Sequence, residues 1–111
     1  MKPFSITTGL DIPGYKIVRN IGVVRGIVVR SRSIIGQFFA GLQTIFGGNI
    51  TVYTNLCEKA RLDAYDLMCE QAERHGANGV IMVRYDTTDI MHGVTEVLCY
   101  GTAVVIEEIK P

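Results

Sequence analysis

The chain has 111 residues, of which 48% are hydrophobic, and its 11 basic side chains balance 11 acidic ones. A domain of this length buries roughly two-thirds of its unfolded surface, so it can form a core without disulfides. The balanced charge offers no basic surface for a phosphate backbone, which argues against nucleic-acid binding. We expect one domain over residues 1–111, and its apolar composition favours self-association.

The cysteines and the first residues indicate the compartment. Cys57, Cys69 and Cys99 are an odd number without framework spacing, which favours a reducing environment. The N-terminal segment lacks the apolar core of a signal peptide, and no apolar run is long enough to span a bilayer. These features predict a cytoplasmic protein without a membrane partner.

The first third of the chain favours β-structure. Residues 4–8 are a candidate edge strand, and residues 11–14 contain Pro and Gly and form a turn. Residues 15–30 are rich in Val and Ile, which predicts a long strand. Gly22 and Gly26 interrupt it, and glycine within a strand marks a bulge, a bend or the close approach of another backbone.

Residues 33–48 predict an unusual helix, because no charged side chain occurs from Ser33 to Cys57. Its large apolar residues share an arc of roughly 140° on a helical wheel. The opposite side is small and uncharged, which predicts contact with another helix or with a second copy of the chain. The expected contact residues of this helix are Gly36, Phe39, Ala40 and Gln43, and the following helix adds Leu62 and Tyr65.

A second helix is expected over residues 56–75, after an extended link over residues 49–53. Asn55 and Glu58 form a capping-box pattern at its start, and Gly76 stands where a left-handed C-cap belongs. One wide stripe of this helix should pack on the sheet: Cys57, Ala60, Ala64, Leu67, Met68, Gln71 and Ala72.

The last third predicts strands over residues 80–86 and 94–108, joined by a loop over residues 87–93. Both alternating sets of side chains in the final strand are apolar, so both of its faces should be buried. One helix layer covers one face, and a subunit this small has little left to cover the other. The expected fold is therefore α+β, with two helices on one face of an antiparallel sheet, in an oligomer.

Five short motifs lie in order along nearly the whole chain: Gly22-Val-Val-Arg-Gly26, Phe38-Phe-Ala-Gly41 with Gly47-Gly48, Ala60-Arg61, Gly76-Ala-Asn78 and Tyr100-Gly-Thr-Ala-Val104. Together they resemble the YbjQ-like family, a bacterial group named for heavy-metal binding whose function is uncharacterised. The resemblance implies an α+β subunit of the dodecin-subunit type, with an antiparallel sheet and a helix layer, that assembles as a ring, a pentamer. It brings no catalytic residues.

Heavy metals favour thiolate and imidazole ligands, so the candidate metal ligands are Cys57, Cys69, Cys99 and His92. The chain contains neither Cys-x-x-Cys nor His-x-x-x-His spacing. Cys57 and Cys69 lie roughly 18 Å apart along one helix, so they cannot bind the same ion within one subunit. A metal site would have to be built across subunits, and the main expectation is that the protein has no cofactor.

Catalytic patterns are weak. The glycine-rich residues 47–49 lack the lysine of a phosphate loop, and Cys57 falls on the packing stripe, where a thiol is expected to be inert. His92 lies beside Asp89 and near Glu96, where a solvated hairpin tip is the simpler interpretation. The sequence therefore favours a protein that is not an enzyme.

A small-molecule cleft between subunits is a further hypothesis, with Arg61 more simply expected to pair with an acidic side chain of a strand. The side chains that could line such a cleft are Tyr15, Tyr53, Tyr65, Tyr85, Tyr100, Arg19, Arg25, Arg61 and Arg84. We expect a homo-oligomer that binds a small ligand or anion between subunits. The alternative is a heavy-metal-binding protein that uses cysteine and histidine ligands across subunits.

Overall fold

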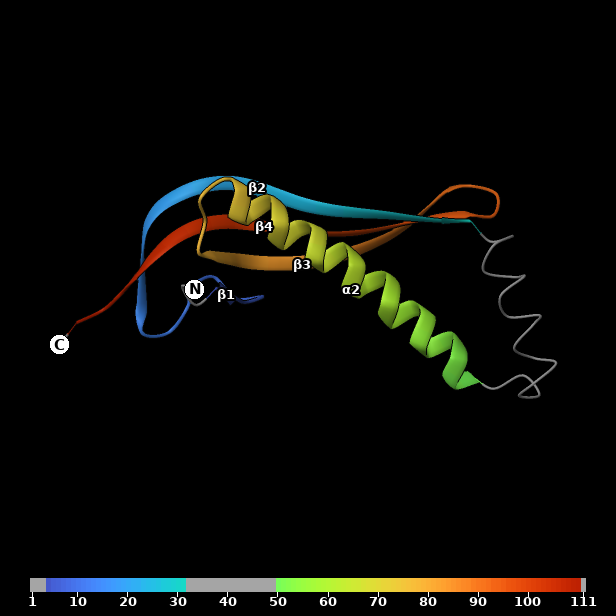
Figure 1. Cartoon of the computed structure of the whole chain (residues 1–111), viewed down its shortest axis with the longest axis horizontal. Helices are drawn as coiled ribbons and strands as arrows, with labels where there is room; N and C mark the ends of the chain where they lie inside the picture. Colours follow the sequence, from blue (N-terminus) through green and yellow to red (C-terminus); the bar gives the residue numbers. More distant parts are fainter. Residues whose placement is uncertain (1–3, 32–49, 111) are drawn as a thin grey trace.

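The computed structural model describes residues 4–31 and 50–110. Its elements, in chain order, are β1 (Ser5–Ile6), β2 (Tyr15–Ser31), α2 (Ile50–Arg74), β3 (Gly79–Met91) and β4 (Val94–Glu108). The strands form one sheet in the order β1-β3-β4-β2, and α2 lies across one face of it (Figure 1). The predicted helix over residues 33–48 lies outside the described residues, so the layer of two helices stays a prediction.

The α+β class is confirmed, but the sheet is mixed rather than antiparallel. β1 pairs with β3 in parallel, through Ser5 with Gly79 and Ile6 with Val80, while β4 is antiparallel to both β3 and β2. A two-residue strand carries too little pattern to predict its direction. Its edge position agrees with the sequence.

The boundaries of α2 and β3 differ from the prediction. α2 begins at Ile50, so the expected extended link over residues 49–53 is wrong from Ile50 onward, and Asn55 is not a cap. The β-branched residues there cost a few tenths of a kcal/mol each in a helix, and extending an existing helix is cheap. β3 continues to Met91, so the expected loop over residues 87–93 is mostly strand.

The C-terminus of α2 is capped as the sequence indicates. Gly76 has a φ of 86°, in the left-handed region. The backbone N–H of Ala77 donates to the carbonyl of Ala72 at 3.0 Å, and that of Gly76 donates to Glu73 at 3.0 Å. These bonds satisfy carbonyl groups at the end of the helix that would otherwise lack partners, and they turn the chain toward β3.

The core lies between α2 and the sheet. Small or flexible side chains recur every four residues along α2, and all are buried: Ala60, Ala64, Met68 and Ala72. They face Gly26 of β2, where an added Cβ would lie 2.0 Å from the carbonyl oxygen of Ala64. The two backbones therefore touch at Gly26, which is the close approach that glycine in this strand predicts. Cys57 and Leu67 were expected in the same stripe, but both are exposed.

The other interrupting glycine, Gly22, lies at a bulge. Its φ is 130°, and the register of β2 against β4 shifts between Ile17 and Arg19 and again between Asn20 and Gly22. β2 bends near its start, where these shifts occur (Figure 1). Beyond them the pairing is regular to Ser31.

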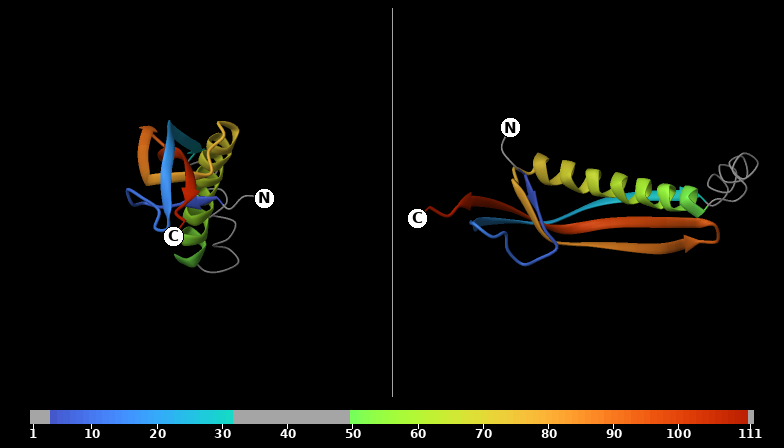
Figure 2. Two further views of the ribbon diagram at one scale, coloured as in Figure 1. Left: turned by 90° about the vertical axis from the view of Figure 1, so that its left-hand side faces the viewer. Right: turned by 90° about the horizontal axis from the view of Figure 1, so that it is seen from below.

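The sheet face away from α2 is covered only in part by described residues. At the β1 end, Ile12 and Tyr15 pack on the buried residues Ile81, Val104 and Ile106. Further along β2 and β4 no described element lies over this face (Figure 2). The expectation that both faces of β4 are buried holds at Ala103 and Val104, which lie on opposite faces. Further along the second face, Leu98 and Tyr100 are only half-buried within one chain.

The molecule is elongated, with extents of 59 × 27 × 23 Å. Its radius of gyration is 17.6 Å, whereas a compact chain of this length has roughly 13 Å. In the described part of the chain, no helix is long and apolar enough to cross a membrane.

Candidate functional site

Among the described residues, two hollows lie along the boundary between α2 and the sheet. The first, which we call the Arg30 groove, has a volume of about 460 Å³ and lies between α2 and the free edge of β2. It is lined by Ile27, Val28, Val29, Arg30, Asp63, Asp66 and Leu67. The second, which we call the Arg61 pocket, has a volume of about 360 Å³ and lies between α2 and β3.

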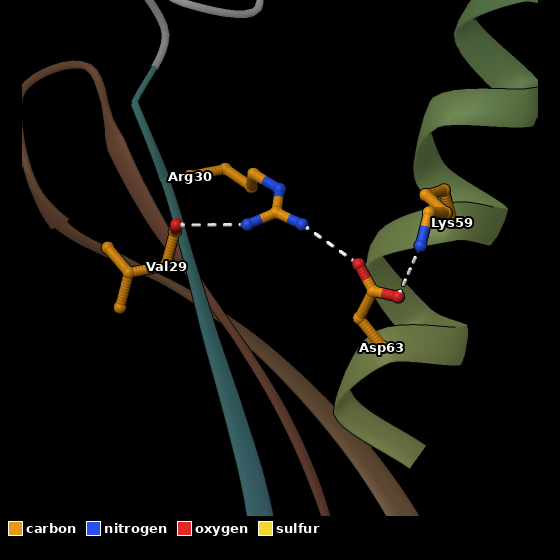
Figure 3. Close-up of polar contacts among 4 residues, drawn as sticks. All are labelled: Val29, Arg30, Lys59 and Asp63. Carbon is orange, nitrogen blue, oxygen red and sulfur yellow. Dashed lines mark hydrogen bonds and ion pairs between the residues drawn. The ribbon is translucent and has the colours of Figure 1, made fainter. Parts of the chain in front are cut away.

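The charges of the Arg30 groove largely pair with one another. Arg30 Nη2 donates to Asp63 Oδ2 at 3.0 Å, and Lys59 Nζ donates to Asp63 Oδ1 at 2.6 Å (Figure 3). The hydrogen bond from Lys59, with the nearby Arg30 charge, lowers the pKa of Asp63. Asp63 therefore links β2 to α2, and its carboxylate is already occupied by two cations. We interpret the groove as a structural contact.

The Arg61 pocket combines aromatic, apolar and charged side chains. Its lining residues are Glu58, Arg61, Leu62 and Tyr65 from α2 and Tyr85 from β3. The guanidinium carbon of Arg61 lies 6.0 Å from the centroid of the Tyr85 ring, within cation–π range. The expected ion pair between Arg61 and a strand acid is absent from the described residues, whose two ion pairs are both made by Asp63. The sequence could not reveal that the partner of Arg61 would be Tyr85, which lies 24 positions later, rather than an acidic side chain.

Two thiols lie near this pocket in protonated form. The Cys99 thiol is fully buried and donates to Met68 Sδ at 3.6 Å. Burial raises the pKa of Cys99 and raises that of Cys69 to about 11. Because the thiolate is the nucleophile and the metal ligand, neither group is primed for reaction at neutral pH.

The tyrosines of the pocket are also held neutral. Burial, followed by the nearby Cys99, raises the pKa of Tyr85 to about 12. Burial also raises the pKa of Tyr65, with Cys69 as the next cause. Both phenols can therefore donate a hydrogen bond at physiological pH.

The structure does not bring the proposed metal ligands together within one chain. Cys57 is exposed on α2, Cys69 is half-buried twelve residues further along the same helix, and Cys99 is buried in β4. His92 is exposed at the turn between β3 and β4. The described residues contain no group of three His, Cys, Asp or Glu side chains that could hold a metal ion. The site across subunits stays a prediction.

The open sheet patch is the most conspicuous apolar surface. We define it as Val23, Ile27 and Val29 of β2 with Leu98 and Tyr100 of β4, which share the face away from α2. Val23 is 72% exposed, Ile27 44% and Val29 51%. Long aliphatic side chains gathered at this exposure are typical of an interaction surface.

Charged side chains lie among the residues of the open sheet patch, in the same rows across the sheet. Arg25 and Arg84 both pair with Tyr100 in register, from opposite sides. One row further along, Asp86 pairs with Leu98, and in the next row Glu96 lies beside Val29. Arg25 therefore lies between Val23 and Ile27, and the charges change from positive in the row of Tyr100 to negative in the rows of Leu98 and Val29.

Of the predicted contact residues, Leu62 and Tyr65 are described and both line the Arg61 pocket. Leu62 is 53% exposed, and Tyr65 is half-buried. The other predicted contact residues, Gly36, Phe39, Ala40 and Gln43, lie outside the described residues. The prediction missed Val23, Ile27 and Val29, although the alternation with buried Val24 and Val28 could have revealed them.

Comparisons with known proteins point to one family. The YbjQ family model, described as "Putative heavy-metal-binding", matches residues 4–107. UPF0145 proteins of Burkholderia mallei (strain SAVP1) and Burkholderia pseudomallei (strain K96243) are each 64% identical over 102 residues, which cover 92% of this chain and 92% of each relative. A crystal structure of a protein of unknown function from Pediococcus pentosaceus, of the DUF74 family, has a similar fold with a TM-score of 0.61. It is 20% identical, and the match covers 94% of this chain and 98% of that chain.

Proposed function

The chain belongs to the YbjQ family and is similar to UPF0145 proteins, and from its surface we propose how it works. We propose that it is a non-enzymatic, cytoplasmic homo-oligomer. In this proposal a neighbouring copy covers the open sheet patch. The patch is the observation that carries the proposal, because it leaves Val23, Ile27 and Val29 largely in water. Covering such side chains stabilises an assembly by about 25 cal/mol for each Å² of apolar surface.

The size of the exposed surface supports assembly. The chain exposes 7596 Å², whereas a compact monomer of 12.2 kDa exposes roughly 6,100 Å². The difference is roughly 1,500 Å², which matches the total area that a standard protein–protein interface buries. The elongated shape therefore exposes about as much extra surface as one interface removes.

The charge pattern favours a second copy over a foreign partner. The whole chain is neutral, so copies do not repel one another by net charge. Arg25 and Arg84 occupy the row of Tyr100, and Asp86 and Glu96 occupy the next two rows, so one copy can present its positive row to the negative rows of the next. Complementary charges of this kind fix orientation more than they add affinity.

The ring of five copies rests on the resemblance to the YbjQ-like family. A ring requires a heterologous contact, in which two different surfaces of the subunit meet. The open sheet patch can supply one of these surfaces. Leu62 and Tyr65 on α2 belong to the opposite side of the subunit, and they are our candidates for the other.

Charge insertion tests the assembly. Ile27→Lys places a charge in the centre of the patch, and we expect the oligomer to dissociate toward smaller species in native mass spectrometry and light scattering. Leu10→Lys is the matched control, because Leu10 is 74% exposed in the segment between β1 and β2, outside the patch. A wild-type protein that is monomeric at tens of micromolar would refute the proposal.

The alternative function is heavy-metal binding across subunits, which the description of the family favours. Exposed Cys57 is the thiol best placed to meet a group from another copy. Native mass spectrometry of untagged protein with added Zn²⁺ or Cd²⁺ tests this alternative. It requires stoichiometric metal that disappears when Cys57, Cys69 and Cys99 are all replaced by Ser.

A non-enzymatic role is supported by the direction of the pKa shifts. Tyr65, Cys69, Tyr85 and Cys99 have raised pKa values, and the pKa of Asp63 is lowered. Each shift moves the pKa of the group further from neutral pH. General acids and bases work best with pKa values near the operating pH, so these five groups are poorly suited to catalysis.

A further inference from the structure

The Arg61 pocket has the composition of a ligand site. Its volume of about 360 Å³ lies at the small end of the range for ligand-binding cavities, which is roughly 300–1,000 Å³. All its lining residues come from one chain, and two separate elements, α2 and β3, hold them in place. A pocket of this size suits a molecule of one or two rings.

Arg61 is the recognition group of the pocket. Its guanidinium faces the Tyr85 ring, and the ion pairs found among the described residues use Arg30 and Lys59 instead. The planar guanidinium can bind a carboxylate through two parallel hydrogen bonds while it keeps its stacking on an aromatic ring. Arg61 is therefore oriented by Tyr85 and can still accept an anion.

The other lining residues narrow the class of ligand. Leu62 and the rings of Tyr65 and Tyr85 offer apolar and aromatic surface, which favours a flat, unsaturated body. Glu58 opposes the single positive charge of Arg61, so the lining is neutral as a whole and disfavours a phosphate or a dicarboxylate. The phenols of Tyr65 and Tyr85 stay protonated and add hydrogen-bond donors.

We propose that the Arg61 pocket binds a small aromatic monocarboxylate, with the carboxylate on Arg61 and the ring against Leu62 and Tyr85. Leu62 and Tyr65 are also our candidates for the second ring surface, so the proposal rests on the pocket staying open beside a neighbouring copy. Titration of the patch variant Ile27→Lys, which is expected to dissociate, separates the two proposals. The ligand proposal also differs from metal binding, because neither the thiols nor His92 take part.

Binding of model compounds to the full chain tests the proposal. Benzoate and indole-3-carboxylate are titrated at pH 7.5 by isothermal calorimetry, and saturation-transfer NMR shows which ligand protons touch the protein. Benzyl alcohol and acetate are the comparison compounds, since the first lacks the charge and the second lacks the ring. We expect saturable binding of the two aromatic carboxylates, with at least tenfold weaker binding of both comparison compounds.

Matched variants assign the site. Arg61→Gln should weaken benzoate binding at least tenfold, or about 1.4 kcal/mol, because it removes the charged donor to the carboxylate. Arg74→Gln removes another exposed arginine of the same helix and should leave the affinity unchanged. Tyr85→Phe should bind nearly as well as the wild type, whereas Tyr85→Ala should bind several-fold more weakly. Circular dichroism checks that each variant is folded.

Three results would overturn the proposal. The first is the absence of saturable binding of either carboxylate to the folded wild-type chain. The second is equal affinity of the wild type and Arg61→Gln, which would place the binding elsewhere. The third is equal binding of benzyl alcohol and benzoate, which would show an apolar surface without charge recognition.

Discussion

Replacing Gly26 by alanine tests the contact between α2 and β2 that organises the core. A Cβ atom at Gly26 would lie 2.0 Å from the Ala64 carbonyl oxygen, 2.6 Å from the Met68 nitrogen and 2.8 Å from the Leu67 Cβ. Two of these three atoms belong to the helix backbone, so no side-chain rotation relieves the clash. The helix has to move away from the strand.

The size of this movement sets the expected loss of stability. An ordinary contact begins near 3.4 Å, so the Ala64 oxygen must retreat by about 1.4 Å (3.4 − 2.0). Overpacking costs about 1–3 kcal/mol, and a gap of about 1 Å loses a quarter to a half of each remaining contact beside it. Alanine also lowers the conformational entropy of the unfolded chain, which offsets about 0.4–1 kcal/mol of the loss in stability. We expect a net loss of about 3 kcal/mol.

Thermal and urea unfolding of Gly26→Ala, at one fixed protein concentration, measures this loss. The melting temperature should fall by roughly 12 °C, at about 4 °C per kcal/mol for a domain of this size. Gly9→Ala is the control, because its Cβ would meet the nearest atom, Thr7 Oγ1, at 3.4 Å. The control should change stability by less than about 1 kcal/mol. Equal stability of the two variants would show that α2 does not touch β2 at Gly26.

Two further predictions concern the cysteines. Iodoacetamide at pH 7.5 should modify exposed Cys57 first in the folded protein, because the pKa of half-buried Cys69 is raised to about 11 and that of buried Cys99 is also raised. Mass spectrometry of Cys57→Ser should therefore show little labelling in the same time. Rapid labelling of that variant would contradict the prediction. The raised pKa of Cys69 favours the neutral thiol in the folded state, so its contribution to stability is complete below about pH 9 and is lost as the pH rises toward 11. Urea midpoints measured between pH 8 and 11 should therefore fall less steeply for Cys69→Ser than for the wild type, and parallel curves would exclude this role.

The sequence predicted the elements whose pattern is repeated over many residues. The bounds of β4 are correct because apolar side chains recur on both of its faces between Val94 and Ile106. The buried stripe of α2 is correct at Ala60, Ala64 and Met68, where small or flexible side chains recur every turn. Long periodic segments are where local preference and tertiary packing agree.

The errors occur where another effect outweighs local preference. The polar segment at Thr87 and Thr88 looks like a loop, but these residues pair in register with Val97 and Glu96 and extend the hairpin. Ile50 begins a helix although its neighbours favour strands. A cross-strand partner that the local sequence does not specify decides the first case, and the low cost of extending an existing helix decides the second.

The candidate site shows the same division. The sequence suggested a cleft between subunits lined by tyrosines and arginines, which stays a prediction. Within one chain, three of its proposed members, Arg61, Tyr65 and Tyr85, line one pocket. The sequence did not predict that Arg61 would face a ring rather than an acid, because that choice depends on how α2 is rotated over β3. The spacing of the cysteines did show correctly that Cys57 and Cys69 lie too far apart along one helix to share an ion.

The paired register shifts at the start of β2 bear on how this chain can change in length. Each shift places two residues of β2 against one of β4, so one residue at each is surplus to the ladder. Deleting Val18 would remove a surplus residue and leave every later side chain on its present face. Deleting Arg25 would invert the strand beyond it, turning Ile27 toward the helix and Val28 outward. Length variants of this protein should therefore be tolerated between residues 17 and 22 and be rejected between residues 23 and 30.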